Sequence, residues 1–235
     1  ERGASQEDGR SALEVVQLKE AKFKETLRLI ERDEHTGLNR HLRIEWQSGL
    51  TCLVDCDDQG HPRQAVIYHP AQQKDRTSAN IKKEAESAPS FSVTDRAVFR
   101  KIIFLADGST VAEETVYDRD QNITETLVRS GADMVVTSYA RDSRVEAVRT
   151  YDGKTGLLTG EMVFTKANRL ASLLVKENGK RARRDIFSEE GARKLSFLYD
   201  EDKVVEVQLW QKDGATLLEK LTRDYSNTTS TVYEN

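Results

Sequence analysis

Proline and cysteine are scarce in this chain of 235 residues, and apolar runs of membrane-spanning length are missing. Each of these features excludes a class of structure. The three prolines are Pro62, Pro70 and Pro89, so none interrupts a strand in the long stretch that follows. Two cysteines are too few for a disulfide scaffold. No stretch approaches the roughly 18–20 apolar residues of a membrane helix, so we expect a protein that does not span a membrane.

Motifs for catalysis and cofactor binding are also missing. The 4 histidines all precede residue 70, and the chain has no Gly-x-Ser-x-Gly elbow, phosphate loop or dinucleotide fingerprint. The net charge is -4, with Lys and Arg interleaved among Asp and Glu, whereas nucleic-acid binding usually needs a basic face. We therefore expect no cofactor and no nucleic-acid partner, and we favour a protein that is not an enzyme.

What the sequence does contain is alternation of apolar and polar residues. Leu42, Ile44 and Trp46 alternate with polar neighbours, and Val205, Val207 and Leu209 do the same nearer the C-terminus. A period of two is typical of a strand with one buried face. Other stretches, such as 102–105 and 173–175, are apolar at successive positions and indicate strands that are covered on both sides.

Turn signals recur along the second half at intervals that leave room for only one short strand each. They are Asp107-Gly108, Gln121-Asn122, Ser130-Gly131, Asp142-Ser143, Asp152-Gly153, Ala167-Asn168, Asn178-Gly179, Glu190-Gly191, Glu201-Asp202, Asp213-Gly214 and Ser226-Asn227. Parallel neighbours would need crossovers of about a dozen residues or more. The sequence therefore predicts an all-β protein, a long antiparallel meander of short strands that forms a strongly curved sheet or an open barrel.

Four segments follow from this pattern. Residues 1–20 are polar, and we expect them to be flexible or partly helical. Residues 21–69 form an N-terminal β-meander, and residues 70–91 form a polar linker or mobile loop. Residues 92–235 form a C-terminal β-meander that we expect to continue the same sheet.

Three segments open with Tyr-Asp before a turn. They are Tyr117-Asp118-Arg119-Asp120-Gln121-Asn122-Ile123, Tyr151-Asp152-Gly153-Lys154-Thr155-Gly156-Leu157 and Tyr199-Asp200-Glu201-Asp202-Lys203-Val204. The part of the chain after residue 98 thereby resembles the YD repeats of Rhs-type secreted bacterial proteins, and it is similar to MORN-like bacterial hairpin repeats. The spacing is unequal, and only Gly153 supplies the glycine expected after the pair. The resemblance implies hairpins that extend a sheet, with a structural or binding role in a bacterial envelope or secreted protein.

Aromatic residues on the expected strands are the candidate ligand-binding residues. Trp46, Tyr68, Tyr139 and Trp210 could line a groove or a concave face, although core packing is the alternative role for such side chains.

The hairpin around residues 52–61 carries the densest chemistry. Asp55, Asp57 and Gln59 match the start of a calcium loop, but Val66 stands where the bidentate acid belongs, so an acidic turn is favoured. Cys52 and Cys56 lie four positions apart, about 13 Å in an extended strand, which separates them too far for one zinc ion or a regular disulfide. We expect no metal here and two free thiols, with a bulged disulfide as the alternative.

These patterns lead us to expect a non-enzymatic binding or scaffolding module of the bacterial envelope or exterior. It would recognise a partner protein or apolar ligand through strand edges or a concave face. One alternative is a lipid or lipoprotein carrier with an open-barrel cavity, and another is a hydrolase whose carboxylates converge from distant strands. The chain begins with Glu1 rather than Met, which indicates a processed or trimmed form and fits a periplasmic or secreted location.

Overall fold

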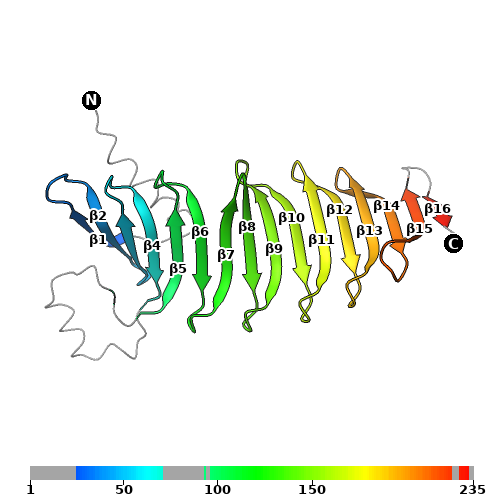
Figure 1. Cartoon of the computed structure of the whole chain (residues 1–235), viewed down its shortest axis with the longest axis horizontal. Helices are drawn as coiled ribbons and strands as arrows, with labels where there is room; N and C mark the ends of the chain where they lie inside the picture. Colours follow the sequence, from blue (N-terminus) through cyan, green and yellow to red (C-terminus); the bar gives the residue numbers. More distant parts are fainter. Residues whose placement is uncertain (1–24, 71–92, 94–95, 224–227, 233–235) are drawn as a thin grey trace. The chain divides into compact units, whose positions relative to one another are not determined.

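A computed structural model describes residues 25–70, 93, 96–223 and 228–232. Throughout these residues the regular structure is β-strand, with no helix, and the strands follow one another in chain order (Figure 1). Every pairing between successive strands within the two units defined below is antiparallel. The predicted all-β antiparallel meander is confirmed.

Packing divides the chain into unit 1, Glu1–Ile123, and unit 2, Thr124–Asn235. The strands of unit 1 are β1 (Glu25–Arg32), β2 (Asn39–Trp46), β3 (Thr51–Cys56), β4 (Pro62–Tyr68), β5 (Val98–Phe104) and β6 (Val111–Tyr117). Those of unit 2 are β7 (Ile123–Ser130), β8 (Asp133–Tyr139), β9 (Val145–Asp152), β10 (Leu158–Phe164), β11 (Leu170–Glu177), β12 (Lys180–Phe187), β13 (Arg193–Asp200), β14 (Lys203–Trp210), β15 (Leu217–Arg223) and β16 (Thr228–Val232).

The strand order within each unit is linear, and the sheet does not close into a barrel among the described residues. Strands β4 and β5, which flank the predicted linker, pair directly from Gln64 with Ile103 to Tyr68 with Val98. The linker itself lies, apart from Pro70, outside the described residues, as do residues 1–20. The search for an apolar helix of membrane-spanning length found none in the described part of the chain.

The turns lie where the sequence predicts them. Each predicted signal from Asp107-Gly108 to Asp213-Gly214 falls at the junction of two strands, and Ser226-Asn227 lies outside the described residues. The connections β7–β8, β11–β12 and β13–β14 have two residues each. In the one that joins β11 to β12, Asn178 and Gly179 have φ values of 51° and 79°. Two successive positive φ values define the hairpin turn whose twist matches that of the flanking strands.

Unit 1 has a buried core on one face of its sheet. The strand register sets Leu42 opposite Val54, Val54 opposite Ala65, and Ala65 opposite Ile102, and all four side chains are buried. Facing residues in a ladder like this bring their Cβ atoms within about 5 Å, so one unbroken row crosses four strands. The row ends at Glu114, which forms an ion pair of 3.2 Å with Arg100 on the same face.

Unit 2 has the same antiparallel pairing of strands, but its side chains are less deeply buried than those in the core of unit 1. All seven positions of β10 are half-buried, and so are the six positions of β8 after Asp133. Strands of alternating chemistry normally have one dry and one wet face. Here both faces are partly covered, which explains why stretches such as Met134-Val135-Val136 are apolar at successive positions.

One close backbone approach within unit 2 gives a test of the fold. The amide of Gly153 donates to the carbonyl oxygen of Ala132 at 2.8 Å, and a Cβ on Gly153 would lie 2.3 Å from that oxygen. We expect Gly153→Ala to lower the free energy of unfolding by about 1–3 kcal/mol, because the two turns must separate.

Urea denaturation followed by circular dichroism measures the change. Gly160→Ala is the matched control, since its nearest contact would be an ordinary 3.5 Å. Equal stability of the two variants would contradict the described contact between the turns.

Candidate functional site

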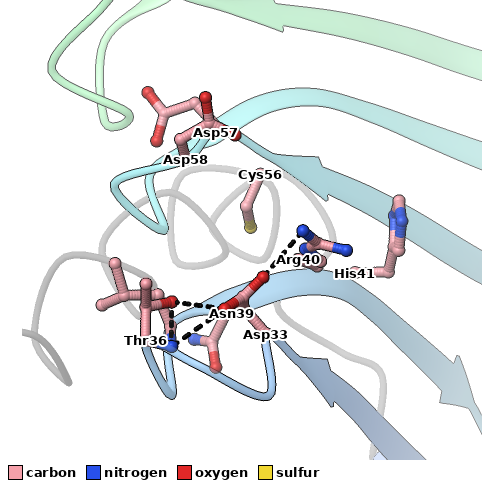
Figure 2. Close-up of a pocket in the computed structure, with 9 residues that line it drawn as sticks. Asp33, Thr36, Asn39, Arg40, His41, Cys56, Asp57 and Asp58 are labelled. Carbon is pink, nitrogen blue, oxygen red and sulfur yellow. Dashed lines mark hydrogen bonds and ion pairs between the residues drawn. The ribbon is translucent and has the colours of Figure 1, made fainter.

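A pocket of about 420 Å³ opens between two loops at one end of unit 1 (Figure 2). The β1–β2 loop and the β3–β4 loop meet there because hairpins two strands apart in a meander turn at the same edge of the sheet. Its lining residues are Asp33, Thr36, Leu38, Asn39, Arg40, His41, Cys56, Asp57 and Asp58.

Two of the pocket carboxylates hold their own turns in shape. Asp33 Oδ1 accepts the backbone N–H of His35 at 3.0 Å and of Thr36 at 2.8 Å, while Asp33 Oδ2 pairs with Arg40 at 2.7 Å. Asp57 Oδ1 accepts two backbone N–H groups at 2.9 Å, those of Gln59 and His61. Such bonds are the usual reason that aspartate occupies the first position of a turn.

The same bonds set the titration of these groups. The backbone N–H groups of Thr36 and His35 lower the pKa of Asp33 below its ordinary value. Burial raises the pKa of Asp57, but the N–H groups of His61 and Gln59 outweigh it, so this pKa is also lowered. Both carboxyls are therefore ionised near neutral pH and cannot serve as the protonated acid of a hydrolase.

The two cysteines are free, and both thiols are held protonated. Burial raises the pKa of Cys52 to about 12, and burial with the nearby Asp57 and Asp55 raises that of Cys56 to about 11. A thiol reacts as its thiolate, so neither cysteine is activated as a nucleophile. In the described part of the chain no group of three or more His, Cys, Asp or Glu side chains is placed to hold a metal ion.

Asp57 and Cys56 stand out in the sequence because they belong to the hairpin with the densest chemistry. Asp33 and Arg40 also line the pocket, but the sequence pattern did not single them out. The signal that could have found Asp33 is its place three residues before Thr36 at the opening of a turn, where Thr36 also donates its hydroxyl at 3.1 Å. What no local pattern shows is that the two loops lie together.

Acid titration tests the role of these carboxylates. Because the folded pKa values of Asp33 and Asp57 are depressed, the stability they contribute is complete above the unfolded value of 3.8. It is lost as the pH falls through the lower folded values. We expect the urea midpoint to decrease below about pH 4, and to decrease less steeply in a variant that combines Asp33→Asn with Asp57→Asn, whose amides do not titrate.

The control is Asp58→Asn, which exchanges a carboxylate in the same pocket for which no such backbone bonds are seen. An identical acid slope for the wild type and the double variant would contradict the assignment.

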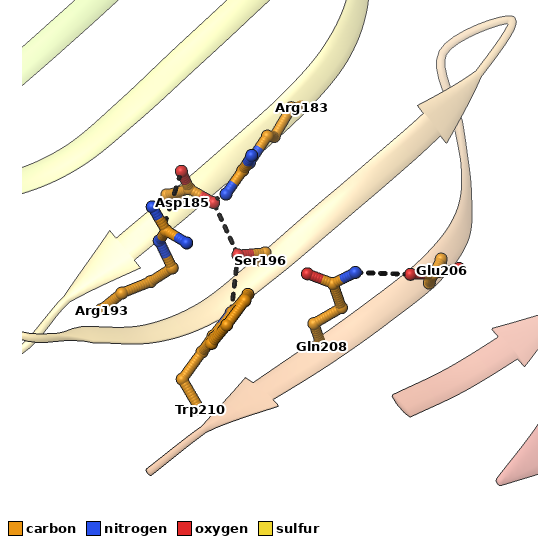
Figure 3. Close-up of polar contacts among 7 residues, drawn as sticks. All are labelled: Arg183, Asp185, Arg193, Ser196, Glu206, Gln208 and Trp210. Atoms are coloured by element: carbon orange, nitrogen blue, oxygen red, sulfur yellow. Dashed lines mark hydrogen bonds and ion pairs between the residues drawn. The ribbon is translucent and has the colours of Figure 1, made fainter. Parts of the chain in front are cut away.

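A second group of polar side chains, the polar cluster, lies on one face of unit 2 (Figure 3). It comprises Arg183, Asp185, Arg193, Ser196 and Trp210, from strands β12, β13 and β14. The Ser196 hydroxyl donates to Asp185 Oδ1 at 2.6 Å and accepts from Trp210 Nε1–H at 2.8 Å. Arg183 donates to the same carboxylate at 2.9 Å, and the Arg193 guanidinium lies 4.8 Å from the centre of the Trp210 ring.

Burial makes this cluster structural. Asp185 is 2% exposed and Ser196 is 0% exposed, covered by the larger side chains around them. A buried carboxylate is tolerated when it is paired and fully hydrogen-bonded, and removing one partner leaves the others unsatisfied. The cluster therefore links three strands on this face.

Ser196→Ala tests that link. The substitution leaves the Trp210 N–H and one Asp185 oxygen without the shared hydroxyl, so we expect a loss of about 1–3 kcal/mol in the free energy of unfolding. Urea denaturation followed by tryptophan fluorescence measures it. The exposed Thr222→Ala on β15 should change stability by less than about 0.5 kcal/mol, and an equally small effect of Ser196→Ala would refute the role of the cluster.

The structure distributes the four predicted aromatic residues over different surroundings. Trp46 is 3% exposed in the core of unit 1, and Tyr68 faces the opposite side, because its neighbour Ile67 shares the core face. In unit 2 the Tyr139 hydroxyl lies 3.3 Å from Thr126 Oγ1, whereas Trp210 belongs to the polar cluster. They are not gathered into one platform within either unit, and ligand binding by any of them stays a prediction.

The face of unit 2 opposite the polar cluster is apolar, and we call it the apolar face. Two cross-strand rows form it, namely Ala147, Val163, Ser172, Ile186, Leu195 and Leu209, and Leu174, Arg184, Phe197, Val207 and Leu221. The first row ends at Glu219, which lies opposite Leu209. Only Ala147 and Ser172 among them are buried, and Leu221 is 37% exposed. At one end Arg149 and Glu161 form an ion pair of 2.7 Å.

Among the comparisons with known proteins, only the one with solved structures gives matches. No family model matches the chain, and no curated protein matches it. The matched structures include a mutant TarM of S. aureus in complex with fondaparinux, α-GlcNAc-glycerol and UDP, at 10% identity and a TM-score of 0.33 over 39% of this chain and 19% of that one. A Photorhabdus luminescens Tc holotoxin pore matches at 9% identity and a TM-score of 0.21, over 85% of this chain and 12% of that one.

This chain spans less than a fifth of each of those two chains, and TM-scores this low carry no argument about fold or function. The fold itself defines the chain as an all-β antiparallel meander of successive hairpins. The resemblance to YD-repeat or MORN-like proteins in particular stays a prediction.

Proposed function

We propose that the protein is a non-enzymatic binding module that holds a partner protein against the apolar face of unit 2. One contrast carries the proposal. The ladder of unit 1 is fully buried from Leu42 to Ile102, whereas the ladder of unit 2 has the same kind of composition and stays half-exposed at Ile186, Leu195 and Leu209. A large contiguous apolar patch on the surface of a folded protein commonly marks a site of interaction.

The chemistry of this face suits a protein partner better than a lipid. Charged side chains lie among the apolar ones, since Arg184 stands between Leu174 and Phe197 in one row. The Arg149–Glu161 ion pair lies at one end of the face. Apolar centres with polar surroundings are typical of protein interfaces, whereas a site for lipid tails would be expected to keep charges out of its apolar interior.

The pocket of unit 1 supports binding over hydrolysis. Asp33 and Asp57 have lowered pKa values, and the thiol of Cys56 has a raised one, so these three groups provide neither a protonated acid nor a thiolate. A glycosidase-type pair needs one carboxyl whose pKa is raised. We also propose a location in the bacterial envelope or exterior, which is what the resemblance to YD-repeat and MORN-like proteins implies.

Site-specific photo-crosslinking tests the proposal. A photoreactive amino acid replaces Leu195 or Leu209 on the apolar face, or Leu198 or Thr222 on the opposite face. Each protein is irradiated in a bacterial envelope extract, and adducts are read by mass spectrometry. We expect one discrete protein adduct from positions 195 and 209 and none from positions 198 and 222.

Competition provides the specificity control. Excess unlabelled wild type should suppress the adduct, whereas a variant with Leu195→Asp and Leu209→Asp, shown to be folded by circular dichroism and urea denaturation, should not. Equal labelling from both faces, no protein adduct at all, or adducts with lipid alone would each overturn the proposal.

A further inference from the structure

Strand β12 carries three arginines, Arg181, Arg183 and Arg184, and the structure gives each a different environment. Arg183 donates to the buried Asp185 at 2.9 Å within the polar cluster. Arg181 forms an ion pair of 3.0 Å with Asp202. Arg184 is exposed, and in the described part of the chain its guanidinium has neither an ion pair nor a hydrogen bond. Two of the three charges are therefore satisfied within the chain, and the third is available to another molecule.

Arg184 belongs to one of the two rows that form the apolar face. The strand register sets it opposite Leu174 on β11 and opposite Phe197 on β13. Ile186, two positions along β12, lies on the same face because side chains alternate along a strand. Apolar side chains thus flank the guanidinium on both neighbouring strands, and a protein that covers this face also covers Arg184.

The acids closest to Arg184 in the strand register are engaged elsewhere. In the same row, two strands away, Glu161 forms its ion pair of 2.7 Å with Arg149. Asp185 is adjacent in sequence, but it lies on the opposite face, where it accepts from the Ser196 hydroxyl at 2.6 Å. Neither carboxylate is placed to pair with Arg184.

A guanidinium that is covered by a partner needs an anion to pair with. Removing a charge from water is unfavourable unless an opposite charge and hydrogen bonds replace the lost water. The planar guanidinium matches a carboxylate, which accepts two parallel N–H groups from it. Arginine is for this reason common among the residues that dominate the binding energy of protein interfaces.

We infer that the partner protein presents an aspartate or glutamate to Arg184, within an otherwise apolar contact surface. The inference rests on the proposed function, because it describes the protein that the apolar face holds. Charge complementarity carries it: one cation without an acid in the described part of this chain stands in an apolar row, so the matching anion comes from the partner.

Arg184→Leu separates this partner from one whose contact surface is wholly apolar. A wholly apolar partner would bind the variant more tightly, because the substitution extends the apolar face. A partner with a carboxylate would bind it more weakly, because its own charge would be buried without a counterion. The two kinds of partner therefore respond in opposite directions.

Competition measures the response. The unlabelled variant, shown to be folded by circular dichroism and urea denaturation, suppresses the photo-crosslinked adduct that position 195 forms in the bacterial envelope extract. We expect Arg184→Leu to require about tenfold more protein than the wild type, or more, for half suppression. The matched control is Lys212→Leu in the exposed β14–β15 turn, which removes an equal charge away from the face and should compete like the wild type.

Arg184→Lys provides a second, chemical readout because it places an amine at this position. A carbodiimide joins an amine to a carboxylate in contact with it, and takes up the water that amide formation releases. We expect an amide bond between position 184 and an Asp or Glu of the same protein that position 195 labels, located by mass spectrometry.

Three results would overturn the inference: half suppression by Arg184→Leu at or below the wild-type concentration, no amide bond from position 184 to the partner, or a bond from it to a carboxylate of this chain. Each of these results leaves the adducts from positions 195 and 209 in place, so the inference can fail while the proposed function stands. Absence of those adducts would overturn both.

Discussion

Contact between side chains that face each other on neighbouring antiparallel strands is the interaction on which the whole structure depends. The described residues contain no helix to cover a sheet, and the packing within each unit runs between consecutive strands. Each strand is therefore held by the one before it and the one after it. Such a fold consists mainly of contacts that are local in sequence, which favours rapid assembly hairpin by hairpin.

The two units use this interaction with different results. In unit 1 the facing residues are aliphatic and buried, so burial of apolar area, at roughly 25 cal/mol per Å², supplies its stability. In unit 2 the buried positions include Asp185 and Ser196, and a polar cluster holds three strands where unit 1 has apolar packing. The side chains on the opposite face of unit 2 are mostly apolar and half-exposed. This difference in burial between the two units is the reason that we propose a partner for unit 2.

Much of the fold could be predicted because its determinants are local. Alternation at Leu42, Ile44 and Trp46 and turn pairs such as Asn178-Gly179 act over a few residues, and each is found where expected. The site could not be predicted in the same way. The pocket joins Asp33 to Asp57 across two strands, and nothing within either loop records that proximity. Asp185 was hidden for another reason, since an acid on an Arg-rich strand looks like a solvated charge until its neighbours are known.

Equivalent ladders are buried in unit 1 and accessible in unit 2. Carbene footprinting of the native protein, read residue by residue by mass spectrometry, measures this directly. We expect strong labelling of Leu195 and Leu209 and protection of Ile44 and Ile67, which are 0% exposed. Protection of all four residues to the same degree would contradict it, because unit 2 would then have a closed core like that of unit 1.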